Sequence, residues 1–311
     1  MGFSYASIIA DAQKARWNID EVLTCVHEID FQRDLLPETL VHVEALGLPD
    51  PQARRCANQI RAHAYLQIFA LCERFILPFV MVHAGRSLHD STEELLALMQ
   101  FGEEEAKHIA LFERFSEAFG FGFGSVCEVI GPQDDIAGSI LAEHPLALSL
   151  AVLHIEWMTQ EHYLRSVRAS VDIDAQFRNM LRFHWIEEAQ HARIDTLIIE
   201  KMVVGQSEDD LREGVRGYLR IMRRLKRAFR DQVELDIEAF ERSGGTLDDT
   251  ERERWREVQV AAYREAFILA GLEHPRFRAT VERNFAGGTG ELVRAARRWA
   301  VPKGMLAATP G

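Results

Sequence analysis

The 311-residue sequence predicts a single all-α domain. Three observations support this prediction. Hydrophobic residues recur at helical spacing along most of the chain, and the alternation typical of strands is nearly absent. Proline and glycine cluster between the long periodic segments. Hydrophobic residues make up 47% of the chain, enough for a sizeable core, and no shift in composition marks a boundary between domains.

The predicted helices follow one another with short breaks. Two N-terminal helices precede four long ones, and three more follow. Ser91 should cap the second long helix, because S-T-E-E places Glu94 three residues later, as in a capping box. A loop at 120–125 and a turn at 131–135 should lead to the third long helix. In chain order, the predicted ranges are about 4–30, 37–46, 51–84, 91–119, 144–170, 173–204, 207–243, 248–271 and 276–300.

Charge, cysteine content and hydropathy narrow the class of protein. The net charge is −12, and the most basic run, 220–232, is flanked by acids, which argues against nucleic acid and anionic membranes as partners. No apolar run reaches the roughly 18–20 residues of a membrane span. The N-terminus has no signal-peptide pattern. Four cysteines without CxxC spacing predict buried thiols in a reducing, cytoplasmic compartment: Cys25, Cys56, Cys72 and Cys127.

Two Glu-x-x-His motifs, Glu105 to His108 and Glu188 to His191, are the first candidates for chemistry. Each motif places a carboxylate and an imidazole on one helix face, although a single motif of this kind is common by chance. The helix before each motif is apolar around most of its circumference and carries a glutamate in its interior. A charge buried there costs several kcal/mol unless it is paired or bound to a metal.

The spacing of these glutamates relates the two helix pairs. Glu73 precedes Glu105 by 32 residues, and Glu156 precedes Glu188 by the same number. Glu161 lies on the same apolar helix as Glu156, and helical-wheel position does not separate the two. The matched spacing favours Glu156, and it predicts two equivalent hairpins whose carboxylates and imidazoles meet at one level of a bundle.

His184 extends this set, because it lies one turn before Glu188 on the same helix face. A glutamate from each of two helices and a Glu-x-x-His from each of the other two are the ligands of ferritin-like di-iron and di-manganese bundles. The sequence therefore predicts a ferritin-like four-helix bundle at about 50–205, with additional N-terminal helices and C-terminal helices at about 207–300. The alternative for His184 is a core histidine bonded to a backbone carbonyl.

With these residues the chain resembles the ferritin-like di-iron N-oxygenases, the family typified by p-aminobenzoate N-oxygenase. The resemblance covers about 60–205, and its specific motif is H-x-x-x-E-x-x-H at 184–191. It implies an oxygen-bridged di-iron centre, O₂ as co-substrate and a homodimer. It also implies seven metal ligands: Glu73, Glu105, His108, Glu156, His184, Glu188 and His191.

The leading hypothesis is an O₂-dependent oxygenase with two iron ions per chain. It would act on a small organic substrate with electrons from an external donor, and amine N-oxygenation is the preferred reaction. Carbon hydroxylation or desaturation at the same centre is one alternative, and an iron-handling ferritin-like protein is another. Fe/Mn and Mn/Mn pairs use the same types of ligand. No catalytic residue beyond the metal centre and no organic cofactor site is predicted.

Residues next to the predicted ligands should orient the imidazoles. Glu104 and Glu187 each precede a predicted ligand, and the resemblance to di-iron bundles implies that a carboxylate at that place holds the imidazole of the facing hairpin. Glu104 would bond His191 and Glu187 would bond His108; the alternative is that both glutamates face solvent. Asp195, one turn after His191, is a rival partner for that ring. Tyr65 is expected to serve packing, and His154 and His162 are expected to be structural or exposed.

Overall fold

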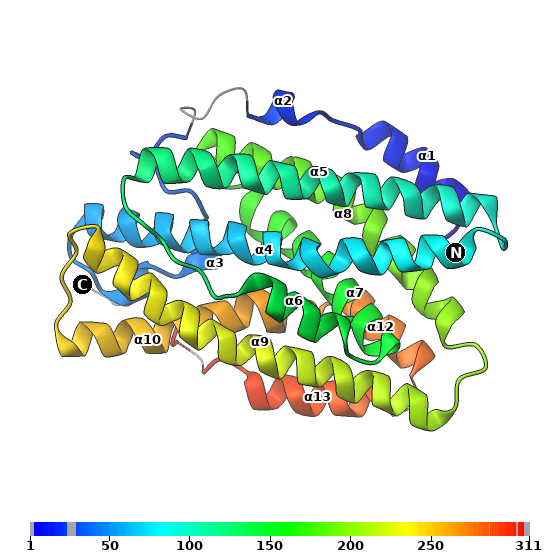
Figure 1. Ribbon diagram of the computed structural model, residues 1–311. Helices are drawn as coiled ribbons and strands as arrows, with labels where there is room; N and C mark the ends of the chain where they lie inside the picture. Colours follow the sequence, from blue (N-terminus) through cyan, green and yellow to red (C-terminus); the bar gives the residue numbers. More distant parts are fainter. Residues whose placement is uncertain (1–2, 24–28, 286, 303, 308–311) are drawn as a thin grey trace.

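Four long helices form the centre of the molecule in the computed structural model, which describes residues 3–23, 29–285, 287–302 and 304–307 (Figure 1). Every regular element in these ranges is helical, and none of them contains a strand. The prediction of an all-α fold is therefore confirmed. The four central helices are α4 (Pro51–Ser87), α5 (Thr92–Phe123), α7 (Pro145–His162) and α8 (Ala175–Met202).

Capping residues fix where these helices begin. The Asp50 carboxylate accepts the N–H of Gln52 at the start of α4, and Ser91 Oγ accepts the N–H of Glu94 at the start of α5. Ser91 is thus the predicted N-cap. The predicted capping box is incomplete, because the Glu94 carboxylate pairs with Lys201 on α8, 3.0 Å away.

The central helices pack as two pairs, α4 along α5 and α7 along α8 (Figure 1). A short connection joins the first pair, so its helices are antiparallel. The second pair follows after a long connection that contains α6 (Gln133–Leu141). Two hairpins joined by one long crossover are the arrangement of ferritin-like bundles, and this arrangement points one apolar face of each helix at the same interior.

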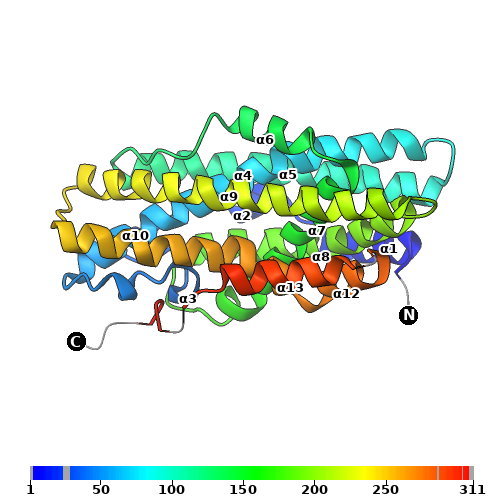
Figure 2. The ribbon, with the colours of Figure 1, turned by 90° about the horizontal axis from the view of Figure 1, so that it is seen from below.

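The C-terminal third of the chain covers one side of this bundle with helices α9 (Glu208–Arg242), α10 (Asp249–Arg264), α11 (Ala270–Glu273), α12 (Pro275–Asn284) and α13 (Gly288–Trp299) (Figure 2). Helix α9 approaches α7 closely at two glycines. A Cβ atom on Gly214 or Gly217 would lie 2.7 Å from the Cβ of Leu146 or Ala147. Because that separation is shorter than a van der Waals contact, side chains at these two positions would push α9 away from the bundle.

The N-terminal segments depart most from prediction. The helix expected over 4–30 is divided into α1 (Tyr5–Ala15) and α2 (Ile19–Val22), and residues 24–28 lie outside the described ranges. Trp17, at the break, is buried against α5 and α8. The helix expected over 37–46 is also divided, into α3 (Glu38–Val41) and the 3₁₀ turn η1 (Glu44–Leu46), because His42 adopts a left-handed conformation (φ 51°).

Several later boundaries also differ. The predicted loop at 120–125 is mostly helical, since α5 continues to Phe123 and ends at Gly124 (φ 75°). The predicted turn at 131–135 contains the start of α6. Two predicted helices contain π-helical segments, η2 (Tyr163–Val167) after α7 and η3 (Glu265–Leu269) between α10 and α11. The helix predicted at 276–300 is two, α12 and α13.

Helix α4, with 37 residues, is the longest of the central helices. Contrary to the expectation from sequence, it is long and apolar enough by composition to span a membrane, and it is the one described helix that is. Within the protein, 61% of its apolar stretch is buried, and it packs along α5. Three cysteines are free thiols, of which Cys72 is buried and Cys56 and Cys127 are half-buried; Cys25 lies outside the described ranges.

Candidate metal centre

All seven predicted ligands lie inside the four-helix bundle, and none is more than 3% exposed. Each helix of the bundle contributes at least one of them, and all face the common interior. Helix α8 carries three because its motif repeats at one-turn intervals. The contributions are Glu73 from α4, Glu105 and His108 from α5, Glu156 from α7, and His184, Glu188 and His191 from α8.

Glu188 occupies the middle of the cluster. Its Oε1 lies 3.1 Å from Nδ1 of His108 and 2.8 Å from Nε2 of His184, and its Oε2 lies 3.3 Å from Nδ1 of His191. One carboxylate therefore contacts all three imidazoles through its two oxygens. A carboxylate placed between imidazoles in this way can bridge two metal ions.

The two Glu-x-x-His motifs interlock across the bundle. His191 Nδ1 lies 2.9 Å from Glu105 Oε1 on the facing helix, and His108 Nδ1 is closer to Glu188 than to Glu105 on its own helix, which is 3.8 Å away. Each imidazole thus faces a carboxylate of the other hairpin. The two hairpins meet at one level, as the equal spacing predicts.

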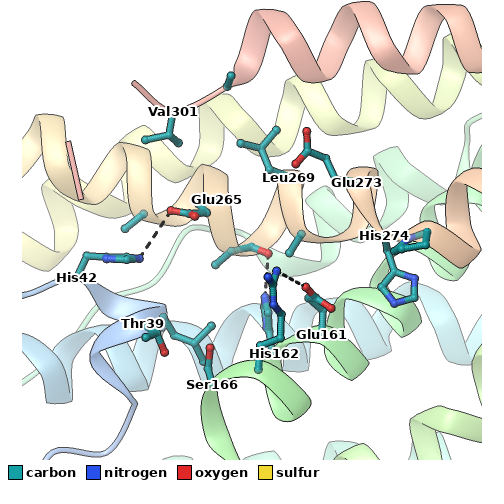
Figure 3. A pocket seen from close by; sticks show the side chains of 17 residues that line it. Thr39, His42, Glu161, His162, Ser166, Glu265, Leu269, Glu273, His274 and Val301 are labelled. Carbon is teal, nitrogen blue, oxygen red and sulfur yellow. Dashed lines mark hydrogen bonds and ion pairs between the residues drawn. The ribbon is translucent and has the colours of Figure 1, made fainter. Parts of the chain in front are cut away.

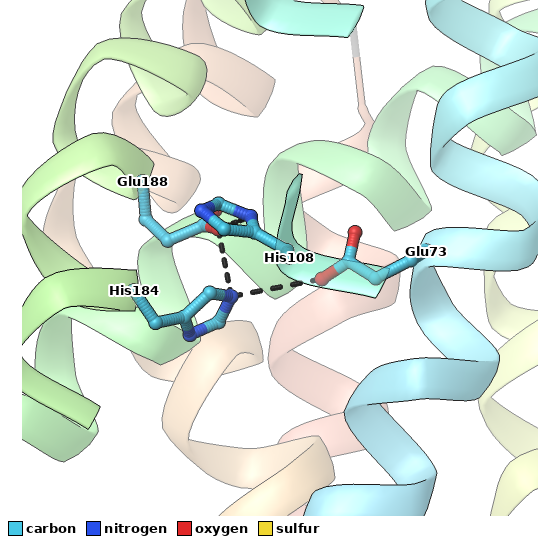
Figure 4. A group of neighbouring side chains, drawn as sticks. All are labelled: Glu73, His108, His184 and Glu188. Atoms are coloured by element: carbon cyan, nitrogen blue, oxygen red, sulfur yellow. Dashed lines mark ion pairs between the residues drawn. The ribbon is translucent and has the colours of Figure 1, made fainter. Parts of the chain in front are cut away.

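His184 turns toward this cluster and not toward a backbone carbonyl (Figure 4). Its Nε2 lies 2.8 Å from Glu188 Oε1 and 3.6 Å from Glu73 Oε1 on α4. Phe69 and Phe112 pack edge-on against the ring, with centroids 5.3 and 5.0 Å away. The packing holds Nε2 at the level of the carboxylates, so the geometry disagrees with the alternative of a core histidine.

The ligand atoms form two overlapping groups, and each group could hold a metal ion. The atoms within a group lie within 4.8 Å of one another, and His108 and Glu188 belong to both groups. The first group is Glu73, His108, His184 and Glu188; the second is Glu105, His108, Glu188 and His191. Two sites that share ligands are the arrangement of a dinuclear centre.

Glu156 lies at the edge of the second group. Its Oε2 is 4.0 Å from Nδ1 of His191, and its side chain is fully buried. Glu161, one and a half turns later, instead pairs with Arg165 at 2.6 Å and lines a cavity elsewhere. Of the two glutamates that the sequence left as alternatives, Glu156 is therefore the one that faces the cluster.

Two hydrogen bonds orient the imidazoles of His108 and His191 on the side that faces away from the cluster, and both were predicted. Nε2–H of His108 donates to Glu187 at 3.0 Å, and Nε2–H of His191 donates to Glu104 at 2.8 Å. Because these bonds fix the ring orientations, Nδ1 of each ring faces the cluster and is free to bind a metal. Asp195, the rival partner of His191, is wrong in that role, because both of its carboxylate oxygens are buried without a hydrogen bond.

The four carboxylates have unequal proton affinities. Burial raises the pKa of Glu73 to about 7. Burial and the neighbouring Glu73 hold the pKa of Glu105 well above its usual range, and burial and Glu188 do the same for Glu156. Burial also acts to raise the pKa of Glu188, but the two imidazoles beside it on α8 outweigh this and hold it well below its usual range. Divalent ions would replace these protons, so metal binding should release protons.

The cluster fits a metal better than it fits a set of hydrogen bonds. Buried atoms of Glu73, Glu105, Glu156 and Glu188 have no hydrogen-bond partner, and neither do His108 Nδ1 and His184 Nε2. These atoms lie close together without the alignment that a hydrogen bond requires. A buried polar atom without a partner costs about 1–3 kcal/mol, and metal coordination would remove that cost for all of them at one site.

Sequence reasoning missed three side chains that enclose the centre. Phe101 stacks on His191 with ring centroids 3.9 Å apart, and Trp17 stacks at 6.2 Å on His108. Lys107 pairs with Glu187 and lies over the Trp17 ring. Trp17 was not identifiable because it lies in a break that was predicted to be helical. The position of Lys107, inside the first Glu-x-x-His motif, was the one signal for its role.

The two buried histidines of α7, His154 and His162, are structural. His162 Nε2–H donates to the carbonyl of Ala266 at 2.9 Å, and its Nδ1 accepts the Tyr65 hydroxyl at 2.8 Å. His154 is held in the same way by the carbonyl of Phe267 and the hydroxyl of Tyr218. Both rings are fully bonded, so neither has a nitrogen left for a metal.

Comparison with protein-family models gives no match, and comparison with curated proteins gives none. Among solved structures, the similar chains include forms of an R2-like ligand-binding oxidase. Two point mutants with an anaerobically reconstituted Mn/Fe cofactor have 14% and 15% identity, each with a TM-score of 0.47 over 88% of this chain and 93% of that chain. The oxidase with an aerobically reconstituted Mn/Fe cofactor has 15% identity and a TM-score of 0.43, over 84% and 91%. These values are too low to place the chain in that family.

Proposed function

We propose that this protein is an O₂-activating di-metal oxygenase that acts on a small organic substrate, with two iron ions as the cofactor. One observation carries the proposal: seven buried carboxylate and imidazole side chains converge from four helices, and six of them have ligand atoms without a hydrogen-bond partner. Four carboxylates balance the charge of two divalent ions. When bound, such a metal pair supplies the electrons and the coordination sites that activate O₂.

We propose amine N-oxygenation as the preferred reaction. The support is His184, which adds a third imidazole to a carboxylate-rich centre and matches the N-oxygenase motif. In the first step of such a reaction, one atom of O₂ would be transferred to the amine nitrogen to give a hydroxylamine. The other atom would leave as water with two electrons and two protons, which an external donor would supply.

The chain's own residues prepare this reaction by holding ligands and excluding water. The hydrogen bonds from Glu104 and Glu187 set the two ring orientations before any metal arrives. Phe69, Phe101 and Phe112 are each no more than 2% exposed and pack against the imidazoles. An apolar wall of this kind protects a strong oxidant from side reactions with water.

Two other functions would use the same residues. Carbon hydroxylation or desaturation needs the same centre and differs in the substrate, and a mixed Fe/Mn or Mn/Mn pair would bind the same ligands. An iron-handling protein would need only the four central helices. The helices after α8 pack on the bundle and line a large open cavity together with it, which favours an enzyme that accommodates an organic molecule. A homodimer in the cytoplasm, with no nucleic acid or membrane partner, completes the proposal.

Oxygen consumption would test the function. The chain is loaded anaerobically with Fe(II), excess iron is removed, and O₂ uptake is followed with and without an arylamine and a chemical reductant. Sustained uptake that depends on the amine, with hydroxylamine or nitro products by mass spectrometry, is expected. Uptake that follows Fe(II) alone and deposits many irons per chain would instead show an iron-handling protein. Hydroxylation of an apolar substrate without amine oxidation would support the alternative reaction.

A further inference from the structure

A cavity of about 1030 Å³ lies outside the metal centre, between the end of α7, the segment around η3 and α11, and residues 300–301 (Figure 3). Its volume is at the upper end of the range of small-molecule pockets, about 300–1000 Å³. Its walls combine polar side chains with the apolar surfaces of Leu40, Leu269 and Val301, so it offers both an apolar surface and fixed polar groups.

Unusual backbone geometry converges on this cavity. Both π-helical segments of the described chain line it, η2 with Arg165 and η3 with Glu265 among others. Segments of this kind are rare and frequently occur at functional sites. His42, which also lines the cavity, has the one positive φ angle among the described non-glycine residues. Conformations of that kind cost about 1–3 kcal/mol and often occur at ligand sites.

His42 and Glu265 present two hydrogen-bond acceptors to the cavity. His42 Nδ1 lies 3.2 Å from the carbonyl oxygen of Leu306, so this nitrogen carries the proton and donates. Burial lowers the pKa of the ring, which favours the neutral form. In that form Nε2 is an acceptor, and it lies 3.7 Å from Glu265 Oε2. Two acceptors that face each other lack a donor between them, and an ammonium group would supply it.

The remaining charges around the cavity leave an excess of acceptors. The one cationic side chain that lines it, Arg165, is engaged with Glu161 at 2.6 Å. Glu273, at the C-terminal end of α11, pairs weakly with Arg278 at 3.8 Å. The end of a helix exposes carbonyl oxygens and carries the negative end of the helix dipole. The cavity is therefore suited to a cation and not to an anion.

Aromatic side chains separate this cavity from the metal centre. His162 lines the cavity and is bonded to Tyr65 behind it. The Tyr65 ring contacts Phe69 with centroids 4.8 Å apart, and Phe69 contacts His184. A molecule in the cavity would therefore not touch the metal ligands unless these rings moved. The cavity is a second site with its own chemistry.

We propose that this cavity binds a small organic amine as its ammonium ion, with the nitrogen between Glu265 and His42 and the apolar body against Leu269 and Val301. The ammonium N–H groups would donate to Glu265 Oε2 and to His42 Nε2. Binding would require no metal, because none of these residues belongs to the cluster in the bundle.

Binding of three probes of nearly equal shape to the full chain tests this proposal. Benzylammonium, benzyl alcohol and benzoate differ in charge, and isothermal calorimetry at neutral pH gives the affinity of each. Benzylammonium should bind at least about tenfold more tightly than the other two, since hydrogen bonds to charged groups are the stronger ones. Equal affinity for benzyl alcohol, tighter binding of benzoate, or no binding of benzylammonium at millimolar concentration would overturn the proposal.

Three variants test whether benzylammonium binds in this cavity. Glu265→Gln should weaken benzylammonium binding about tenfold or more, and Val301→Trp should weaken it by placing an indole ring where the apolar body would lie. Glu253→Gln, an equal change of charge on the exposed face of α10, should leave the affinity unchanged. Unchanged affinity in Glu265→Gln, with circular dichroism showing a folded chain, would contradict the proposal. The measurements use both metal-free and iron-loaded protein, so their outcome does not depend on whether the proposed oxygenase activity is correct.

Discussion

Two groups of histidines are equally buried in this protein, but their ring nitrogens face different partners. In the bundle centre, His184 and His191 direct nitrogen atoms at carboxylates of neighbouring helices. On α7, His154 and His162 direct theirs at backbone carbonyls of η3 and at tyrosine hydroxyls. Burial and residue type do not separate the groups. The partner of each nitrogen does, because a carboxylate and an imidazole nitrogen that face each other can bind the same metal ion, whereas the nitrogens that face carbonyls and hydroxyls are used by hydrogen bonds.

The two groups of histidines also differ in whether backbone carbonyls hold their rings. The π-helical segment η3 directs the carbonyls of Ala266 and Phe267 at the two rings. Gly271 allows close approach, since a Cβ there would lie 2.6 Å from the His154 ring. The structural histidines are thus held by main chain from the C-terminal helices. The ligand histidines are held by side chains alone, and these can reorganise around an ion.

The largest expected effect is the loss of both metals in Glu188→Ala. This carboxylate contacts all three imidazoles and belongs to both ligand groups. Iron content after anaerobic loading should fall from about two per chain to none. Glu161→Ala, which removes a glutamate from outside the cluster, should keep both irons. Retention of two irons by the Glu188 variant would show that the centre is elsewhere.

A smaller loss is expected in Glu156→Ala, because Glu156 lies at the edge of one group and is 4.0 Å from His191. At least one of the two irons should be lost, measured by iron analysis against the same Glu161→Ala control. If Glu161→Ala loses iron and Glu156→Ala keeps it, the two hairpins are not equivalent, and the assignment drawn from the 32-residue spacing is wrong.

Removing a carboxylate that hydrogen-bonds a ligand imidazole should lower the metal affinity by an intermediate amount. Glu187→Gln keeps the shape of the side chain but removes the charge that holds His108 and Lys107. Metal affinity should fall about 10–100-fold, the usual cost of losing such a partner. Competition with a chelator measures the change, and Glu200→Gln is the matched control, because Glu200 is a half-buried glutamate of α8 that pairs with Arg283 away from the cluster. An unchanged affinity would mean that the hydrogen bond does not orient the ring.

The structural histidines should respond in the opposite way. His162→Phe should keep two irons but leave the Tyr65 hydroxyl and the Ala266 carbonyl without their partner, at a cost of about 1–3 kcal/mol each. Chemical denaturation gives the free energy of unfolding, and iron analysis gives the metal content. Loss of iron from a folded His162→Phe chain would move this histidine into the metal centre.

The pH dependence of the free energy of unfolding should also distinguish the structural histidines from the ligand histidines. Burial lowers the pKa of His162 to about 4, below the 6.5 of an unfolded chain. Between these values the unfolded state binds more protons, so this stabilisation is complete above pH 6.5 and is lost as the pH falls toward 4, by as much as about 3 kcal/mol. His162→Phe should show a shallower loss of stability over this range than the parent chain. Equal slopes would mean that the ring is already protonated in the fold.

The sequence was sufficient for the long helices and for the contacts behind the ligands. Periodicity located α4, α5, α7 and α8 because each has a strong apolar pattern and a capping residue. The bonds of Glu104 and Glu187 were predictable because related di-iron bundles carry a carboxylate next to the ligand that holds the imidazole of the facing hairpin. The choice of Glu156 followed from spacing and agrees with its position in the cluster.

Breaks within the predicted helices and contacts between segments far apart in the chain were not predictable from local sequence patterns. The break at Trp17 depends on burial of that ring against α5 and α8, which no local pattern records. The left-handed His42 ends α3 without a glycine to signal it. The π-helical segments have no sequence signature of their own, so the cavity that they line could not be predicted from the sequence either. Asp195 matched the spacing of a ring partner but lacks the bond.

The position of iron in crystals of the loaded protein tests the central claim most directly. Anomalous diffraction at the iron edge should give two peaks per chain between α4, α5, α7 and α8. A nitrogen of His184 should lie about 2.0–2.2 Å from one of them, the range of zinc–imidazole bonds. Two peaks with His184 turned to a backbone carbonyl would leave a di-metal protein without support for N-oxygenation. No peak in the bundle, or a single tetrahedral site, would contradict the dinuclear centre itself.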